Sequence, residues 1–331
     1  MNKIVLIDEW GSFLSVKKGR FILKVKENGK LKIKWEVAPV EVDTIAFIVT
    51  GASISAEAIK LASEFGIDLV FLNKTKPLAR IIPSNYGSTM KNWEYQLNAF
   101  NDINKRVKLA KLFIEGKIHN QRVILREWFK KLKASGKSDY NYLEDEIIRL
   151  DEYQSKLKDV NSVEEIMSIE AHAAKRYWMC ISRILPKELE FKGRMIHKEG
   201  PIDPFNRALN IGYSILKKEV WRAIFLAGLN PYLGFLHSSR AGKVSLVFDV
   251  MEEFRPIAVD RPLINLARKD KDVILKLKEN KSEDLAKIWS TISSVLYSSN
   301  KPLCNTIVAQ ARLLAKHLRG TDEYKPFKAK W

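Results

Sequence analysis

Residues that could bind a divalent metal ion are concentrated in two segments of the sequence, 163–181 and 229–256. Glu170 lies in the first segment, and His237, Asp249, Glu252 and Glu253 lie in the second. Carboxylate oxygens combined with one imidazole suit Mg²⁺ or Mn²⁺ better than a structural zinc site, which favours thiolates. A metal ion held in this way activates water or a hydroxyl group for attack on a phosphodiester.

Glu170 lies on the apolar face of a predicted helix. A carboxylate on such a face is costly unless a metal ion or an arginine neutralises it. A structural salt bridge and a partly exposed groove position are the alternatives. The apolar residues of this face are spaced by threes and fours and comprise Val163, Ile166, Met167, Ala174, Tyr177, Trp178 and Ile181.

His237 and the acidic cluster Asp249, Glu252 and Glu253 each have a simpler interpretation. A single histidine before a Gly-containing loop is often a structural hydrogen-bonding residue. Residues three and four apart are neighbours on a helix, so the acidic cluster also fits a solvated helix face. The basic residues nearby favour the metal interpretation, because a phosphate-binding groove needs both a metal ion and cations.

The charge of the whole chain indicates an acidic partner. The sequence has 57 Lys and Arg against 39 Asp and Glu, a net charge of +18, for which nucleic acid is the usual counterpart. A membrane surface is the rival partner, but no apolar run approaches 18 residues and the N-terminus lacks a signal-peptide pattern. A Lys-rich surface set by genome bias or a thermophilic origin is the other alternative.

The two cysteines indicate a reducing compartment. Cys180 and Cys304 are far apart, and each lies in an apolar helical context. They are expected to be buried core residues rather than zinc ligands, and the expected location is the cytoplasm.

The elements that position these residues fall into two regions, so the fold class is α+β. Residues 1–85 contain short β-strands, a hairpin turn at Asn28-Gly29, and one helix opened by Ser55 and closed by Gly66. Residues 86–92 are the predicted linker. Residues 93–331 have helical periodicity and form the predicted all-α catalytic domain, which ends in a mobile basic tail. The predicted helices are 93–115, 117–134, 140–159, 162–185, 203–227, 246–254, 261–278, 282–298 and 302–319.

The segment GFLHSSRAGKVSLVFDVMEEFRP closely resembles the signature of the universal CRISPR-associated adaptation integrase family, the first-numbered of the CRISPR-associated proteins. The segments DPFNRALNIGYSILKKEVWRAIFLAGLNP, IEAHAAKRYW, GKIHNQRVIL and SAEAIKLASEFGIDLVFLN are similar to the same family. The resemblance therefore covers essentially the whole chain.

This resemblance implies a site and a reaction. It assigns the metal ligands to Glu170, His237 and Glu252, choosing Glu252 over Glu253, and it places Asp249 as a further acidic residue beside the site. It implies metal-dependent endonuclease activity and insertion of new spacers into a CRISPR array. The implied partners are double-stranded DNA, a second copy of the chain bound largely through the β-rich domain, and the small second subunit of the adaptation complex.

The implied chemistry is a transesterification in which a 3′-hydroxyl attacks a phosphodiester of the repeat. Two other functions remain open: a non-catalytic scaffold that holds DNA ends, and a nuclease selective for branched DNA. Charge and chain proximity suggest DNA contacts near the site at Arg194, Arg207, Arg240, Lys243 and Arg255.

Overall fold

The structure is a computed structural model that describes residues 4–27, 30–73, 76–82, 88–136, 140–195, 202–237, 242–279, 282–298 and 300–330. The chain divides into two compact units. The first contains residues 1–99, 221–231 and 311–323, and the second contains residues 100–220, 232–310 and 324–331. The predicted hairpin turn and residues 86 and 87 of the predicted linker lie outside the described residues, whereas residues 88–92 belong to helix α2 (Ser88–Asn101). The predicted domain boundary at residues 85–93 stays a prediction.

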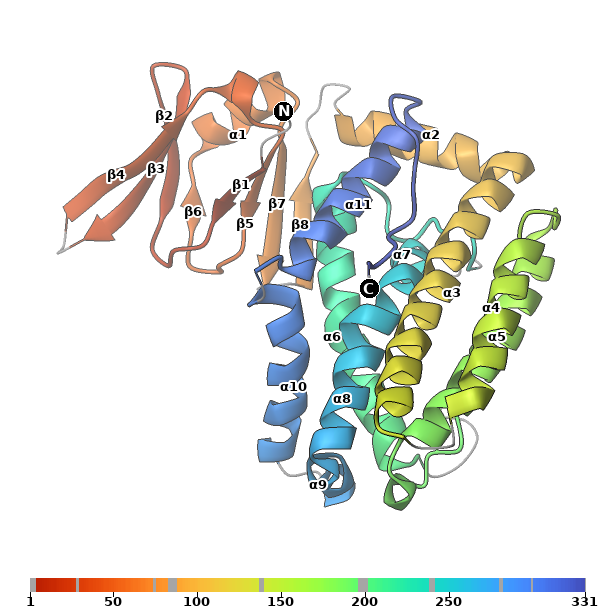
Figure 1. Ribbon diagram of the computed structural model, residues 1–331. Helices are drawn as coiled ribbons and strands as arrows, with labels where there is room; N and C mark the ends of the chain where they lie inside the picture. The colour runs from red at the N-terminus through yellow and green to blue at the C-terminus, as the bar shows by residue number, and fades with distance from the viewer. Residues whose placement is uncertain are drawn as a thin grey trace. The chain divides into compact units, whose positions relative to one another are not determined.

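The first unit contains two four-stranded sheets (Figure 1). In one sheet, three parallel strands are followed by an antiparallel edge strand, in the order β1 (Ile4–Ile7), β5 (Thr44–Phe47), β7 (Asp68–Asn73) and β8 (Lys76–Ile81). The other has the order β4 (Lys30–Val37), β3 (Arg20–Glu27), β2 (Phe13–Lys17) and β6 (Ser53–Ile54). The antiparallel pairing of Glu27 with Lys30 confirms the predicted hairpin strands.

Helix α1 (Ala56–Glu64) begins where the sequence predicts. The Ser55 hydroxyl accepts a hydrogen bond from Ala58 N, and Glu57 lies in the first turn. Gly66 follows the helix with φ of 65°, a conformation that favours glycine. A short 3₁₀ turn, η1 (Pro39–Glu41), precedes β5. Buried Ile7, Leu14, Phe21 and Ile45 belong to the core of this unit, which explains why its strands are rich in β-branched and aromatic residues.

Helices dominate the rest of the chain, as predicted. Helices α3, α4 and α5 pack against one another, and α7 packs on α3. The helices are α2 (Ser88–Asn101), α3 (Ile103–Ala134), α4 (Asn141–Lys156), α5 (Val163–Ile184), α6 (Pro204–Leu226), α7 (Ser245–Arg255), α8 (Arg261–Lys269), α9 (Lys271–Leu275), α10 (Ser282–Tyr297) and α11 (Leu303–Leu318), with short helical turns η3 (Lys187–Leu189), η4 (Pro256–Asp260) and η5 (Lys276–Glu279).

The predicted helix break near residue 116 is wrong. The break occurs at Asp102, whose carboxylate accepts hydrogen bonds from Asn104 N at 3.0 Å and Lys105 N at 3.1 Å and so caps α3. Gly116 lies inside the 32-residue helix α3. A Cβ at this position would be 3.0 Å from the Glu253 side chain and 3.1 Å from Pro326, so close packing rather than a chain break accounts for the glycine.

The predicted single helix over residues 261–278 is also wrong. Helix α7 runs directly into the π-helical turn η4, which leads into α8, and Asp270 then separates α8 from α9. Pro256 has no N–H to donate to the residue four positions earlier, and a π turn accommodates this missing hydrogen bond. The π turn places Asp260 in the interior, where it is 1% exposed.

The C-terminal segment (residues 322–330) is not the mobile tail that the sequence suggests. Tyr324 is buried, and the Phe327 ring stacks on Phe254 with a centroid distance of 4.8 Å. Ala329 N donates to Asn120 Oδ1 at 2.8 Å. These contacts hold the C-terminal segment against α3 and α7. The sequence predicts mobility because this segment is rich in lysine and its apolar residues Tyr324 and Phe327 follow neither helical nor strand periodicity.

No helix in the described part of the chain is long and apolar enough to cross a membrane.

Candidate metal and nucleic-acid site

Glu170 lies at the edge of the buried face of α5. Val163, Ile166 and Tyr177 of the predicted apolar face are buried, but Met167 is 47% exposed. The Glu170 side chain is 26% exposed as a result. The helix therefore places this carboxylate at a boundary between core and solvent, where it can reach a ligand.

Helix α7 carries its acidic residues into the interior of the second unit. Asp249 and Glu253 are 0% exposed, and Glu252 is 3% exposed. Val250 and Phe254 of the same helix are buried as well. The alternative of a solvated acidic face is therefore contradicted, since carboxylates at such depth need partners of their own.

Asp249 holds the chain around His237 in one conformation. Its Oδ2 accepts hydrogen bonds from Phe235 N at 2.5 Å and Leu236 N at 3.0 Å, and its Oδ1 accepts one from His237 N at 2.9 Å. The same Oδ1 lies 2.7 Å from His237 Nδ1. This contact places the imidazole proton on Nδ1 and leaves the Nε2 lone pair available to a metal ion.

Gly234 makes this arrangement possible by close approach. A Cβ at residue 234 would lie 2.7 Å from Asp249 Oδ2 and 2.8 Å from Ser245. Any side chain there would displace the Asp249 carboxylate from the backbone N–H groups that donate hydrogen bonds to it.

Lys117 of α3 lies between two of the predicted ligands. Its ammonium forms an ion pair with Glu170 and is 2.6 Å from Glu252 Oε2, while Arg255 Nη1 is 3.2 Å from Glu252 Oε1. Burial opposes ionisation of Glu252, but Arg255, Lys117 and His237 outweigh it and lower its pKa to about 2. Burial also lowers the pKa of Lys117, but Glu252 and Glu170 outweigh it, and the net shift is upward. Both groups are therefore charged at neutral pH.

The residues here fit a metal ion, with Lys117 as the competing cation. Glu170, His237 and Glu252 line one cavity of about 30 Å³, room enough for a single ion or water molecule. Oε2 of Glu252 is buried and makes no hydrogen bond of acceptable geometry, although it is close to Lys117. As placed, no three His, Cys, Asp or Glu side chains of the described chain surround one point. Carboxylate and imidazole groups are donors of the kind that Mg²⁺ and Mn²⁺ accept, and the Lys117 ammonium lies beside both carboxylates.

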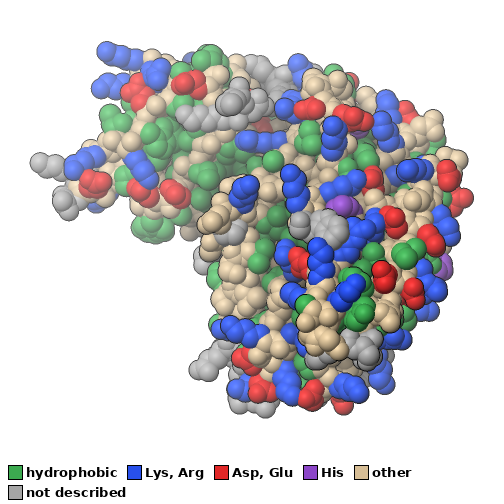
Figure 2. All heavy atoms as spheres, in the orientation of Figure 1, with side chains coloured by type: hydrophobic (Ala, Val, Ile, Leu, Met, Phe, Trp, Pro, Cys, Tyr) green, Lys and Arg blue, Asp and Glu red, His purple; other side chains and the backbone are tan. Residues whose placement is uncertain are grey.

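A larger basic cleft adjoins this cavity and shares Glu170 with it. The cleft measures about 670 Å³, and its cationic lining side chains are Lys117, Lys175, Lys192, Arg194 and Arg255. Cations around a carboxylate site suit a phosphate-bearing substrate. Figure 2 shows further Lys and Arg side chains spread over the drawn face of the molecule.

Tyr213 and Asp260 form one wall of the cleft, and Asp260 is also bonded to the buried Tyr177. Tyr213 and Tyr177 donate hydrogen bonds to Asp260, at 2.6 Å and 3.2 Å. Burial raises the pKa of Asp260 to about 6, against the opposing effect of these two hydrogen bonds. The guanidinium groups of Arg194 and Arg255 each lie over the Tyr213 ring, at 5.3 Å and 5.2 Å from its centroid. The wall thus fixes two cations of the cleft.

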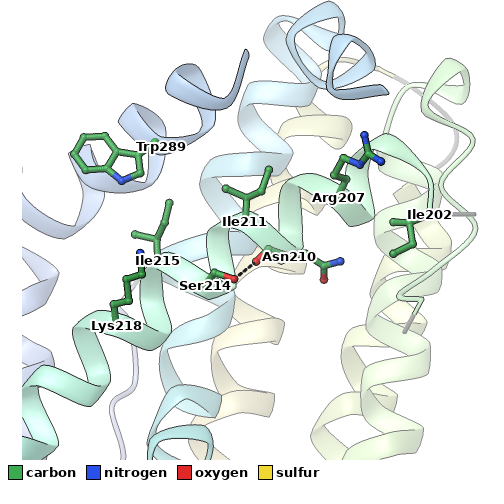
Figure 3. A pocket seen from close by; sticks show the side chains of 8 residues that line it. All are labelled: Ile202, Arg207, Asn210, Ile211, Ser214, Ile215, Lys218 and Trp289. Carbon is green, nitrogen blue, oxygen red and sulfur yellow. Dashed lines mark hydrogen bonds between the residues drawn. The ribbon is translucent and has the colours of Figure 1, made fainter. Parts of the chain in front are cut away.

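The five predicted DNA contacts have different positions. Arg194 and Arg255 line the cleft, with Arg194 also bonded to Asn206 Oδ1 at 2.7 Å. Arg207 lines a separate groove of about 650 Å³ along α6 (Figure 3). Lys243 is half-buried just before α7 and lines neither of the two hollows. Arg240 lies outside the described residues. All five DNA-contact assignments stay predictions.

Lys117 and Gln121 are site residues that the sequence reasoning missed. They follow Ile114 and Ile118 at helical spacing, and all four residues are buried. A cation on an apolar face carries the same signal that identified Glu170. The predicted helix break at Gly116 hid this pattern, because it assigned Ile114 to one helix and Lys117 to the next.

The fold and the site together define a class: a two-unit α+β protein whose helical unit holds a carboxylate and histidine cluster beside a basic cleft. The model of the family described as CRISPR associated protein Cas1 matches residues 5–281. The chain therefore belongs to the Cas1 family, and the resemblance seen in the sequence is confirmed.

Relatives and solved structures agree with this assignment. The CRISPR-associated endonuclease Cas1 1 of Saccharolobus solfataricus is 43% identical over 99% of this chain and 85% of the relative. The protein of the same name from Archaeoglobus fulgidus is 32% identical over 99% of each chain. A casposase bound to integration product matches with a TM-score of 0.81 and 26% identity, over 98% of each chain.

Proposed function

We propose that this chain is a metal-dependent DNA endonuclease and integrase that inserts new spacers into CRISPR arrays. The observation that carries the proposal is the cavity lined by Glu170, His237 and Glu252, which shares Glu170 with a basic cleft. The relatives named as Cas1 endonucleases and the casposase bound to integration product support the activity.

Glu170, His237 and Glu252 would hold a Mg²⁺ or Mn²⁺ ion, and Asp249 would orient the His237 ring. When bound, the ion polarises a phosphoryl oxygen and lowers the pKa of the attacking hydroxyl group or water. Arg194, Arg255, Lys175 and Lys192 would hold the phosphates of the DNA.

The reaction we propose is an in-line phosphoryl transfer. The 3′-oxygen of the incoming DNA forms a new bond to a phosphorus atom of the repeat, and the bond from that phosphorus to the 3′-oxygen of the repeat strand breaks. The number of phosphodiester bonds stays the same, and the released 3′-oxygen takes up a proton. With water as nucleophile, the same displacement nicks DNA. The partners in this proposal are a second copy of the chain and the small second subunit of the adaptation complex.

The test is a joining assay with labelled DNA ends and a supercoiled plasmid that contains the repeat, with Mn²⁺ and with or without the second subunit. We expect Glu170→Gln, Glu252→Gln and His237→Ala to reduce joining and nicking to background while duplex affinity is largely kept. Glu219→Gln is the matched control for Glu252→Gln, because Glu219 is also buried but accepts a hydrogen bond from Tyr297 on α10.

Full activity in all three site variants would overturn the metal-site assignment. Binding without cleavage in the wild-type protein would indicate a scaffold for DNA ends. Cleavage of branched DNA that needs neither repeat nor partner would indicate a general structure-selective nuclease.

A further inference from the structure

The C-terminal segment lies against α3 and α7, the two helices whose contact brings Lys117 next to Glu252. Lys117 Nζ is 2.6 Å from Glu252 Oε2, and Glu252 lines the cavity of the candidate metal site. Figure 1 shows that the chain ends beside these two helices. None of the described residues of the segment lines the cavity, so any effect of the segment on the site must pass through the helices.

On α3, the residues that contact the C-terminal segment share one face of the helix. Gly116 and Asn120 are four positions apart and lie on this face. Gly116 is so close to the segment that a Cβ there would be 3.1 Å from Pro326 and 3.3 Å from Phe327 O. Because Lys117 directly follows Gly116, a shift of this face against the segment moves Lys117 as well.

Asn120 joins the C-terminal segment to both helices. Its side chain is fully buried. Its Nδ2 donates to Glu253 O of α7 at 2.7 Å and to Phe327 O at 3.0 Å, and its Oδ1 accepts from Ala329 N at 2.8 Å. Hydrogen bonds are directional, whereas apolar contacts are not. A buried and fully bonded network of this kind therefore fixes the register of α3 against α7.

On α7, the residues bonded to the C-terminal segment are Glu253 and Phe254, which directly follow Glu252. The Glu253 carboxylate accepts hydrogen bonds from the Tyr324 hydroxyl at 2.5 Å and from Phe327 N at 2.6 Å. The Phe254 and Phe327 rings stack with an interplanar angle of 11°. The segment therefore holds α7 at the two positions next to a proposed metal ligand.

We propose that Asn120 and Phe327 are positioning residues for the metal site, through which the C-terminal segment keeps α3 and α7 at the spacing that the site needs. Groups of such a site must be held within about 0.5 Å of their productive geometry by the contacts around them. Helix α7 has 11 residues, and a helix of this length depends on packing against its neighbours for its stability. The inference deepens the proposed function and rests on it, because it names residues that position the same site.

The test measures Mn²⁺ affinity by calorimetric titration of full-length variants, at a temperature where each is folded. We expect Phe327→Ala to weaken Mn²⁺ binding by about ten-fold to a hundred-fold, the usual range for loss of a group that supports metal ligands. Phe327→Tyr keeps the ring and should retain the wild-type affinity. Asn120→Leu keeps most of the side-chain volume but makes none of the three hydrogen bonds, so it should weaken Mn²⁺ binding in the same way.

Two controls separate positioning from a general loss of stability. Leu296→Ala truncates a fully buried side chain of α10 and should lower the unfolding temperature without a change in Mn²⁺ affinity. Lys330→Ala, at an exposed lysine of the C-terminal segment, should alter neither quantity. Hydrogen exchange followed by mass spectrometry gives a readout without metal. The amides of α3 near Asn120 and those of α7 should exchange faster in Phe327→Ala but not in Leu296→Ala.

The outcomes separate this proposal from the proposed function. Wild-type Mn²⁺ affinity in both Phe327→Ala and Asn120→Leu, with lower stability alone, overturns the positioning role and leaves the proposed function intact. An equal loss of Mn²⁺ affinity in Leu296→Ala, or unchanged exchange of α3 and α7 in Phe327→Ala, overturns the positioning role as well. A wild-type protein that neither binds Mn²⁺ nor joins DNA overturns the proposed function, and the positioning role with it.

Discussion

Lys117 lies between Glu170 and Glu252, the two carboxylates of the proposed metal site. The two carboxylates and the ammonium form a buried cluster in which each charge has an opposite neighbour. Removing one member of a buried ion pair leaves an uncompensated charge and typically costs about 3–5 kcal/mol.

We therefore expect Lys117→Met to lower the stability of the metal-free protein and to increase the stabilisation produced by Mn²⁺. The ion would then replace Lys117 beside the two carboxylates, while Arg255 stays paired with Glu252. Thermal unfolding with and without Mn²⁺ measures both effects. Lys175→Met, which alters an exposed lysine of the same cleft, is the control. An equal Mn²⁺-induced shift in wild type and Lys117→Met would contradict competition between the two cations.

In the proposed site, Asp249 would act through His237, which it contacts, rather than on a substrate. Replacing it with asparagine leaves fewer acceptor positions for three backbone N–H groups and one ring N–H. Loss of such an orienting residue typically costs about 10- to 100-fold in metal affinity. We expect Asp249→Asn to weaken Mn²⁺ binding by this amount in a calorimetric titration. Asp260→Asn, at another buried aspartate, should affect stability but not Mn²⁺ affinity, and a normal Mn²⁺ affinity in Asp249→Asn would argue against the orienting role.

At this scale the sequence predicted some residues and not others, for physical reasons. The helical spacing of apolar residues identified Glu170, because its carboxylate lies on the same helix face as those apolar residues. The family resemblance was needed to choose Glu252 over Glu253 as a ligand, because both residues are neighbours of Asp249 on the helix. Contacts between Lys117 and Glu170 join residues 53 positions apart, and no local pattern encodes such a pair.

The helices and the turns between them determine which of these side chains are buried and which reach the cleft. Helix α7 is buried, yet it is followed by the π turn η4 rather than by a loop. The turn brings Asp260 to Tyr177 and Tyr213, where it is 1% exposed. The π turn was not predictable from apolar periodicity, because Pro256 alone permits either a kink or an end of the helix.

This burial gives Asp260 a defined effect on the pH dependence of stability. Its pKa is about 6 in the folded protein, raised by burial from 3.8. Between these two values the unfolded chain holds fewer protons than the folded chain, so stability falls as pH rises from about 4 to about 6. The contribution lost is about 3 kcal/mol. Urea unfolding across this range should show a shallower pH dependence in Asp260→Asn, and identical slopes would place the pKa of Asp260 near its ordinary value.

The C-terminal segment completes the packing of α7 on its far side. Glu253 accepts hydrogen bonds from the Tyr324 hydroxyl at 2.5 Å and Phe327 N at 2.6 Å. Asn120 donates to Glu253 O at 2.7 Å and to Phe327 O at 3.0 Å. Glu253, which spacing alone could not distinguish from Glu252, therefore has a structural role. Glu252 lines the cavity, whereas Glu253 makes its hydrogen bonds to the C-terminal segment on the opposite side of α7.

For the whole molecule, the proposed function makes electrostatics the main factor in the encounter with DNA. A net charge of +18 and a cleft lined by five cations predict duplex affinity that falls steeply with salt concentration. The fold class was predictable from the sequence because periodicity changes from two to 3.6 along the chain. The cleft was not, since its cations come from α3, α5, α7 and the loop after η3.

We expect Lys175→Ala and Lys192→Ala each to reduce the slope of log affinity against log salt by about one. Anisotropy titrations with a labelled duplex at several salt concentrations measure this slope. Lys60→Ala on α1, where the side chain is 77% exposed, should leave the slope unchanged. A slope that none of the cleft substitutions alters would place the DNA elsewhere on the protein.

The close approach of Gly234 to Asp249 has a consequence for how natural variants of this protein are interpreted. A gene copy could keep codons for Glu170, His237 and Glu252 and still have lost its activity through one change at residue 234, because any side chain there collides with Asp249. Under the proposed function, a host strain with such a copy would keep all three ligand residues and yet gain no new spacers. Surveys of degenerate loci should therefore inspect this glycine alongside the three ligands.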